Sequence, residues 1–178
     1  MESPYDKIKA AWAESAYEDI SIGIAQGIHK LCESPIEKIL AEALAVLHAT
    51  YLEGYGAYPH LIGLAATVDE PWLFNINPQV QIGKYRVDFM VECAACPERK
   101  LAVECDGHEY HERTKEQAKH DKSRDRFFIT SGLSVMRFTG SEIYKDPVAC
   151  ALEVARFFEQ FVSWDKLQDK AEELVAYR

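Results

Sequence analysis

The chain of 178 residues lacks any apolar run that approaches the roughly 18 residues needed to cross a bilayer. Its first residues, MESPYDKIKA, lack the basic segment followed by an apolar one that marks a secretory signal. It has five cysteines, an odd number, which without an export signal favours reduced thiols and predicts a cytoplasmic location. These absences argue against a membrane protein and against a secreted domain held together by disulfides.

Basic residues are also scarce, since 20 Lys and Arg stand against 29 Asp and Glu, a net charge of −9. Taken alone, this balance argues against a polyanionic partner, because phosphate binding requires cations. The acidity is local, however. Residues 1–70 contain 4 basic and 11 acidic side chains, whereas residues 71–147 contain 12 of each. The middle of the chain is charge-dense but neutral, so a nucleic-acid partner stays open.

The apolar spacing predicts a single α/β domain over residues 1–178. The sequence Ser34-Pro35-Ile36-Glu37 is typical of a helix start, with Ser as the cap and Glu in a capping box. Residues 50–75 are predicted to be a long connection with one short element around 61–68. Strands are predicted at 85–91, 101–106 and 133–138, and helices at 5–32, from 36 onward, and at 114–131, 147–161 and 164–178.

Alternation within the first two predicted strands indicates which side chains share a face. Val87 and Phe89 fall on one face and Asp88 on the other, while Glu104 and Asp106 share one face of the next strand. Neighbouring strands lie about 4.8 Å apart, so the three carboxylates would converge if the register allows. Such acids repel one another unless a cation lies among them, and Mg²⁺ or Mn²⁺ suits carboxylate ligands. The alternative is a solvated acidic strand face.

Histidines and cations follow these acids along the chain. GHEYH contains His108 and His111, and the predicted helix beyond it has basic residues at helical spacing, namely Lys115, Lys119, Lys122 and Arg126. Metal ligands, a histidine and cations are the groups that phosphodiester hydrolysis needs. The alternatives are a packing role for the histidine and a solvated face for the helix.

Four segments in order carry a family resemblance: SPIEKILAEAL, INPQVQIGKYRVDFMV, KLAVECDGHEYH and HDKSRDRFFITSGLSVMRFTGSEI. Together they resemble the restriction-endonuclease-like PD-(D/E)XK superfamily, in particular small domains related to very short patch repair endonucleases. The resemblance runs from about Ser34 to Glu153. It implies an α/β restriction-endonuclease-like core at about 34–158, a mixed β-sheet flanked by helices. A helical extension at 1–32 and a helix at 164–178 would lie outside this core.

The resemblance implies catalytic roles for five residues. Asp88 and Glu104 match the acids of the two active-site strands and, with Asp106, are the expected metal ligands. Glu37 matches an acid of the first core helix, although the capping box alone also explains its position. His111 resembles a histidine near the scissile phosphate and is the candidate general acid/base.

The resemblance also implies residues that contact nucleic acid. Gln79 matches a glutamine before the first active-site strand, and Arg124 matches an arginine that faces the site. Lys119 and Lys122 lie near Arg124 and are expected to hold the phosphate backbone.

One position departs from the superfamily pattern, because its common lysine, two residues after the second acid, is Asp106 here. An aspartate cannot stabilise developing negative charge. Either Lys119 or Lys122 replaces the lysine, or His111 and the metal suffice, or the activity is weak or absent.

The sequence therefore predicts a metal-dependent endonuclease that uses Mg²⁺ or Mn²⁺ to cut DNA, with RNA left open as a substrate. The alternative is a catalytically weak or silent module that binds nucleic acid or a protein partner. Apolar positions in residues 1–32 favour a further contact there, in a homodimer or with another protein, and no membrane partner is expected. Cys93 and Cys96 form a C-x-x-C that is either a hairpin turn or half of a zinc site.

Overall fold

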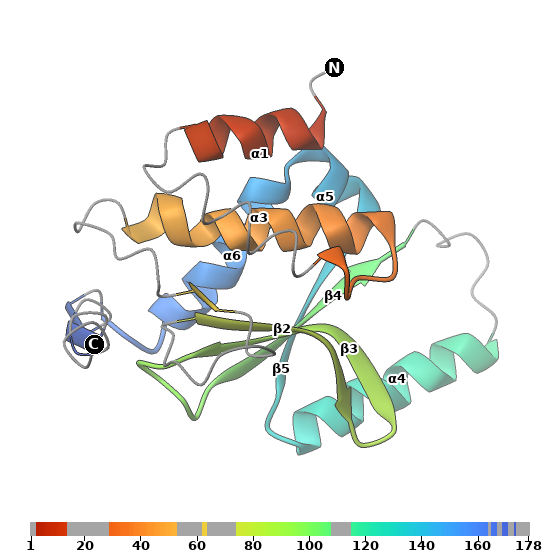
Figure 1. Ribbon diagram of the computed structural model, residues 1–178. Coiled ribbons are helices and arrows are strands. Elements are labelled where there is room, and N and C mark those ends of the chain that lie inside the picture. The colour runs from red at the N-terminus through yellow and green to blue at the C-terminus, as the bar shows by residue number, and fades with distance from the viewer. Residues whose placement is uncertain are drawn as a thin grey trace.

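A computed structural model describes residues 3–13, 29–52, 62–63, 74–107 and 115–163, with the helical positions 165–166, 169–170 and 173. The helices are α1 (Pro4–Ala13), α3 (Pro35–Leu52), α4 (Lys115–Thr130), α5 (Gly140–Lys145) and α6 (Pro147–Glu159). The strands are β1 (Ile62–Gly63), β2 (Phe74–Ile82), β3 (Tyr85–Cys93), β4 (Lys100–Asp106) and β5 (Ser134–Thr139). Figure 1 shows α1, α3, α5 and α6 on one side of the sheet and α4 on the other.

Within the described residues the strands form one sheet in the order β1-β2-β3-β4-β5. The pairs β1/β2 and β4/β5 are parallel, whereas β2/β3 and β3/β4 are antiparallel. This mixed sheet flanked by helices confirms the predicted fold class. The sequence reading missed β2, which has Pro78 in its centre, and it missed the short helix α5.

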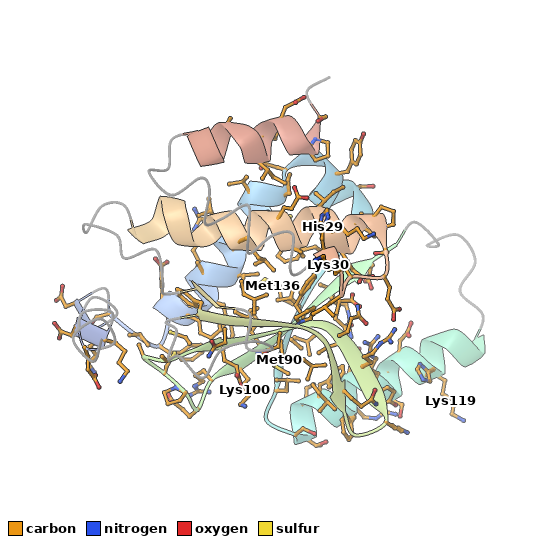
Figure 2. All side chains as sticks on the ribbon, viewed as in Figure 1. His29, Lys30, Met90, Lys100, Lys119 and Met136 are labelled. Atoms are coloured by element: carbon orange, nitrogen blue, oxygen red, sulfur yellow. The ribbon has the colours of Figure 1, made fainter. Side chains whose placement is uncertain are left out.

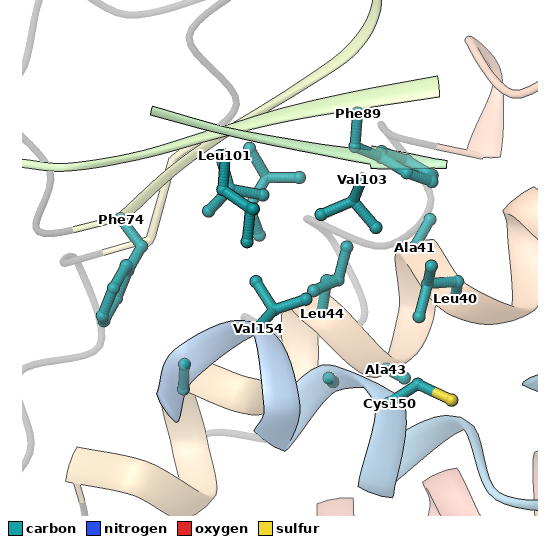
Figure 3. Close-up of a cluster of buried hydrophobic side chains, with 14 of the residues drawn as sticks. Leu40, Ala41, Ala43, Leu44, Phe74, Phe89, Leu101, Val103, Cys150 and Val154 are labelled. Atoms are coloured by element: carbon teal, nitrogen blue, oxygen red, sulfur yellow. The ribbon is translucent and has the colours of Figure 1, made fainter. Parts of the chain in front are cut away.

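The main hydrophobic core lies between the sheet and helices α3 and α6, as Figure 3 shows. Leu40 and Leu44 of α3 and Val154 of α6 are fully buried against Phe89 and Val103 of the sheet. Helix α1 extends this core, since Ile8 is 1% exposed. Part of the apolar face expected to bind a partner is therefore covered by the chain itself, and residues 14–28 lie outside the described residues.

A second apolar cluster lies between the sheet and α4, and it corrects the predicted alternation of β3. Tyr85 and Val87 pack with Phe128 of α4, whereas Phe89 belongs to the main core on the opposite side. Residues two apart in a regular strand share a face, so β3 changes face at the intervening Asp88. Figure 2 shows the same two-sidedness, with Met90 on the α4 side of the sheet and Met136 on the other.

The β2–β3 hairpin turns at Gly83, whose φ of +58° belongs to the left-handed region that glycine adopts freely. A Cβ at this position would lie 2.7 Å from Cζ of Phe127, so the hairpin and α4 approach too closely for a side chain. Glycine therefore fixes both the turn and its contact with α4. Among the helices of the described segments, none is both long and apolar enough to span a membrane.

Candidate active site

Helix α3 begins as predicted, because the Ser34 hydroxyl accepts a hydrogen bond of 3.2 Å from the Glu37 amide. The Glu37 side chain also points inward and is only 7% exposed. Its Oε2 accepts hydrogen bonds from the amide of Glu33 at 2.9 Å and from Nε2 of Gln79 at 2.8 Å. The Ser34 cap is therefore formed, whereas the Glu37 side chain binds the Glu33 amide in place of the Ser34 amide that a capping box uses.

Gln79 lies in the middle of β2 with a φ of +54°, in the left-handed region, which is unusual for a residue other than glycine. Pro78 pairs with Phe89 and Val80 with Val87, so Gln79 lies opposite Asp88 at the point where β3 changes face. Its Oε1 is buried and has no hydrogen-bond partner among the described residues. Backbone strain held in place by a fold is typical of functional sites.

Asp88 is half-buried, and its Oδ2 accepts a hydrogen bond of 2.7 Å from the Cys105 amide of β4. Burial raises the pKa of this carboxyl to about 6 against the opposing effect of that hydrogen bond, and the neighbouring acids Glu37 and Glu104 raise it further. None of the cations in the described segments forms an ion pair with Asp88. Arg124 lowers the pKa of Asp88 in the opposite direction, but the net shift is upward, so Asp88 is a carboxylate whose charge no described ion pair offsets.

Glu104 is the most buried acid of the site, at 2% exposed. Its Oε1 accepts from Nη2 of Arg124 on α4, and its Oε2 accepts a 3.0 Å hydrogen bond from Nε of Arg137 on β5. Burial raises the pKa of Glu104, and the two guanidinium groups oppose this shift. Because a buried charge is costly unless it is paired, the two arginines are what allow a carboxylate in this position.

The register brings Asp88 and Glu104 together on adjacent strands. Phe89 pairs with Val103 at the end of the antiparallel β3/β4 ladder, and Asp88 and Glu104 are the next residues on the two strands. They lie close enough for Glu104 to raise the pKa of Asp88. Cys105 packs against the main core while Glu104 contacts α4, so the predicted alternation in β4 is confirmed.

The predicted metal ligands do not all converge. The described residues include no group of three His, Cys, Asp and Glu side chains arranged to share one ion. Both oxygens of Glu104 bind arginines, Oε1 that of Arg124 and Oε2 that of Arg137, so neither is free for a metal ion in this structure. Asp106 is half-buried and, like Asp88, forms no ion pair within the described part of the chain. These two unmatched oxygen donors beside a third acid still fit a hard divalent ion in their chemistry.

The cations expected to bind nucleic acid lie on α4. Lys119 and Lys122 are exposed, and neither forms an ion pair with another described residue. Figure 2 shows Lys119 on the outer part of this helix. Arg124 instead points to the sheet, donating from Nη2 to Glu104 and, at 2.6 Å, to the main-chain oxygen of Arg86. His111 and His108 lie outside the described residues, so the role of His111 stays a prediction.

The sequence reading missed Arg137 as a member of this site. It lies directly beside Glu104 in the parallel β4/β5 ladder, and its Nη2 also donates to Oδ1 of Asp125 on α4 at 2.6 Å. The signal in the sequence was an arginine between apolar residues of the strand SVMRFT, which lies in the last of the four segments that carry the family resemblance. An arginine that is partly buried in this way is expected to have a charged partner.

Cys93 and Cys96 are both buried at the end of β3, and the Cys96 amide donates to the Cys93 carbonyl at 3.1 Å. Burial raises the pKa of the Cys93 thiol to about 12. The hairpin-turn interpretation describes their local structure, because this hydrogen bond closes a turn between the antiparallel strands β3 and β4.

These features define a restriction-endonuclease-like fold with a buried acidic and arginine-rich centre on adjacent strands. Residues 70–158, half of the chain, match the model of REase_MTES_1575, a restriction-endonuclease-like family, and the chain belongs to this family. The match covers β2 through α6 and thus most of the candidate site, while Glu37 lies before it. Comparison with curated proteins and with solved structures returned no match. The family suggests a nuclease function.

Proposed function

We propose that this protein is a metal-dependent endonuclease that hydrolyses phosphodiester bonds in DNA. The observation that carries the proposal is the pair Asp88 and Glu104, a half-buried and a buried carboxylate on adjacent strands of a restriction-endonuclease-like fold. Burying an acid without a matched cation destabilises a fold, so Asp88 is better explained by a ligand than by stability.

Asp88, Glu104 and Asp106 are the residues that would hold Mg²⁺ or Mn²⁺ in this proposal. When bound, such an ion lowers the pKa of a water molecule and neutralises charge on the phosphate. To bind the ion, Glu104 would give up its hydrogen bond with Arg124. Its hydrogen bond with Arg137 would stay in place.

The protein's own groups would then orient and stabilise the reacting phosphodiester. Arg124 would donate to the phosphate oxygens, because its Nε is buried and has no partner in the described residues. His111 would move the proton to or from the reacting oxygens. Glu37 and Gln79, which are hydrogen-bonded to each other, would hold the position of β2 next to Asp88. Lys119 and Lys122 would contact neighbouring phosphates of the nucleic-acid backbone.

A second candidate is a silent module that binds nucleic acid or a protein without cutting. Two observations favour it: an aspartate stands where the superfamily has its lysine, and both oxygens of Glu104 are held by arginines. Titration calorimetry with MgCl₂ separates the two. Uptake of the ion supports the enzyme, and no uptake together with no cleavage supports the binding module.

The experiment that tests the proposal is a cleavage panel of supercoiled plasmid, linear duplex, single-stranded and mismatched DNA, with Mg²⁺, Mn²⁺ or EDTA. We expect cleavage of at least one DNA form with metal and none with EDTA. An Asp88→Asn preparation, purified identically, controls for contaminating nucleases. Metal-independent cleavage, or cleavage that persists in Asp88→Asn, would contradict the proposal.

A further inference from the structure

The two arginines that bind Glu104 are held in different ways. Arg137 joins two carboxylates on separate elements, since its Nε contacts Glu104 of β4 at 3.0 Å and its Nη2 contacts Asp125 of α4 at 2.6 Å. Glu104 and Asp125 therefore hold the guanidinium from two sides. Arg137 itself lies on β5, directly beside Glu104 in the β4/β5 ladder. A planar fork that binds two acceptors loses little freedom for each hydrogen bond that it makes.

Arg124 is held more loosely by acidic groups. Glu104 is its one carboxylate partner in the described residues, and its other acceptor is the main-chain oxygen of Arg86. Its Nε is buried without an acceptor. A buried donor without a partner is costly, so Arg124 gains hydrogen bonds if an anionic ligand enters the site.

We infer that Arg137 is a positioning residue for the proposed phosphodiester hydrolysis, which keeps Glu104 oriented while Arg124 moves to the substrate phosphate. The inference rests on the proposed function and assigns the two arginines separate roles. Glu104 is 2% exposed, and it would be a buried anion without a cation if Arg124 left and Arg137 were absent. Arg137 binds Oε2, so Oε1 is the oxygen that becomes available to a metal ion.

The role of Asp125 follows from the same geometry. It lies on α4, one residue after Arg124, and it anchors the far end of the Arg137 guanidinium. Removing its charge leaves the Arg137–Glu104 hydrogen bond in place but frees one end of the fork. Asp125→Asn is therefore expected to have the same effects as a change at Arg137, but smaller.

The test compares Arg137→Lys with Arg156→Lys, a matched change at an exposed position of α6. Lysine keeps the charge but cannot bind Glu104 and Asp125 as a fork. Partners that orient metal ligands alter metal affinity or rate by about 10–100-fold. We expect Arg137→Lys to lower the single-turnover cleavage rate at saturating DNA by about 10-fold or more and to raise the Mg²⁺ concentration for half-maximal rate similarly. DNA affinity measured with Ca²⁺ should stay within about twofold of wild type.

A direct binding measurement separates this inference from the proposed function. Binding of Mn²⁺, followed by electron paramagnetic resonance, should weaken in Arg137→Lys and not in Arg156→Lys, whether or not cleavage occurs. Near-ultraviolet circular dichroism verifies that each variant is folded. If Arg137→Lys does not fold, Asp125→Asn serves as the second variant.

Unchanged rate and Mn²⁺ binding in both Arg137→Lys and Asp125→Asn would overturn the positioning role. A loss confined to DNA affinity would also overturn it, since Arg137 would then be a phosphate contact. If wild type neither cleaves nor binds Mn²⁺, the proposed function fails and this inference with it.

Discussion

Gln79 donates a hydrogen bond of 2.8 Å from Nε2 to Oε2 of Glu37, which joins the centre of β2 to the first turn of α3. Gln79 makes this contact from a left-handed backbone, with φ of +54°, directly opposite Asp88. Two parts of the chain that are 42 residues apart thus meet at the acid that the site depends on. The contact links the first turn of α3 to β2 at the residue where β2 departs from regular geometry.

Two substitutions at Gln79 separate its side chain from its backbone. Gln79→Gly and Gln79→Ala both remove the hydrogen bond to Glu37, but only glycine adopts a positive φ without cost. We expect Gln79→Gly to be more stable than Gln79→Ala by about 1 kcal/mol in urea unfolding. An alanine variant as stable as the glycine variant would contradict the strained backbone. Cleavage should fall equally in both, because both lack the amide.

The half-buried charge of Asp88 predicts how stability depends on pH. Burial raises the pKa of this carboxyl in the folded protein to about 6 from an ordinary 3.8, so the folded state binds the proton more tightly than the unfolded state. Stability is therefore lost as pH rises from about 4 through 6. Asp88→Asn has no charge to bury. In EDTA it should match wild type near pH 4 and be more stable by about 1–3 kcal/mol at pH 7.

Chemical unfolding of both proteins at the two pH values measures this difference. The expected gain is notable because the same change is predicted to abolish activity, as is common when a site is built at the cost of stability. A difference between the proteins that does not change with pH, or a variant less stable at pH 7, would contradict the assignment of Asp88 as an unmatched acid.

The packing of the β2–β3 hairpin on α4 is tested at Gly83. Gly83→Ala places a Cβ 2.7 Å from Phe127 in a backbone with φ of +58°, whereas Gly132→Ala, with φ of +70°, meets open space. We expect Gly132→Ala to lose about 1 kcal/mol and Gly83→Ala to lose about 1–3 kcal/mol more. Equal losses in urea unfolding would show that the hairpin does not press against α4.

The cations of α4 are tested by the salt dependence of DNA binding. Each lysine that contacts a phosphate contributes about 0.9 to the slope of log affinity against log salt concentration. The double change Lys119→Gln and Lys122→Gln should reduce this slope by about 2 on duplex DNA, measured by fluorescence anisotropy in Ca²⁺. Lys145→Gln, on α5 at the other side of the sheet, is the control. An unchanged slope in the double variant would place the nucleic acid elsewhere.

Local signals allowed much of the fold to be predicted. Ser34 and Pro35 fixed the start of α3, and Gly132, with its left-handed φ, fixed the end of α4. β2 was missed because a proline such as Pro78 argues against a central strand. In the folded chain Pro78 nevertheless pairs with Phe89 of β3. The change of face at Asp88 was missed because it coincides with the irregular backbone of Gln79 on the neighbouring strand. The alternation of residues within one strand does not reveal such an effect of its neighbour.

Strand spacing predicted the neighbouring positions of Asp88 and Glu104, but it missed the contact between Glu104 and Arg137. Asp88 and Glu104 follow from strand spacing, and the chain places them on adjacent strands. Arg137 becomes a partner of Glu104 only through the parallel β4/β5 ladder, whose register follows from the whole crossover through α4. Spacing also predicted that the three acids converge. It could not show that Arg124 and Arg137 bind both oxygens of Glu104, because these contacts depend on tertiary structure.

The most direct test of the central claim is the single-turnover rate of DNA cleavage in Mg²⁺ for wild type, Asp88→Asn and Asp165→Asn. Asp165 is an exposed acid in the helical positions after α6 and makes the matched change away from the site. We expect cleavage by wild type and Asp165→Asn at rates within about twofold, and a rate at least about 100-fold lower in a folded Asp88→Asn. Cleavage by Asp88→Asn at the wild-type rate would contradict this expectation.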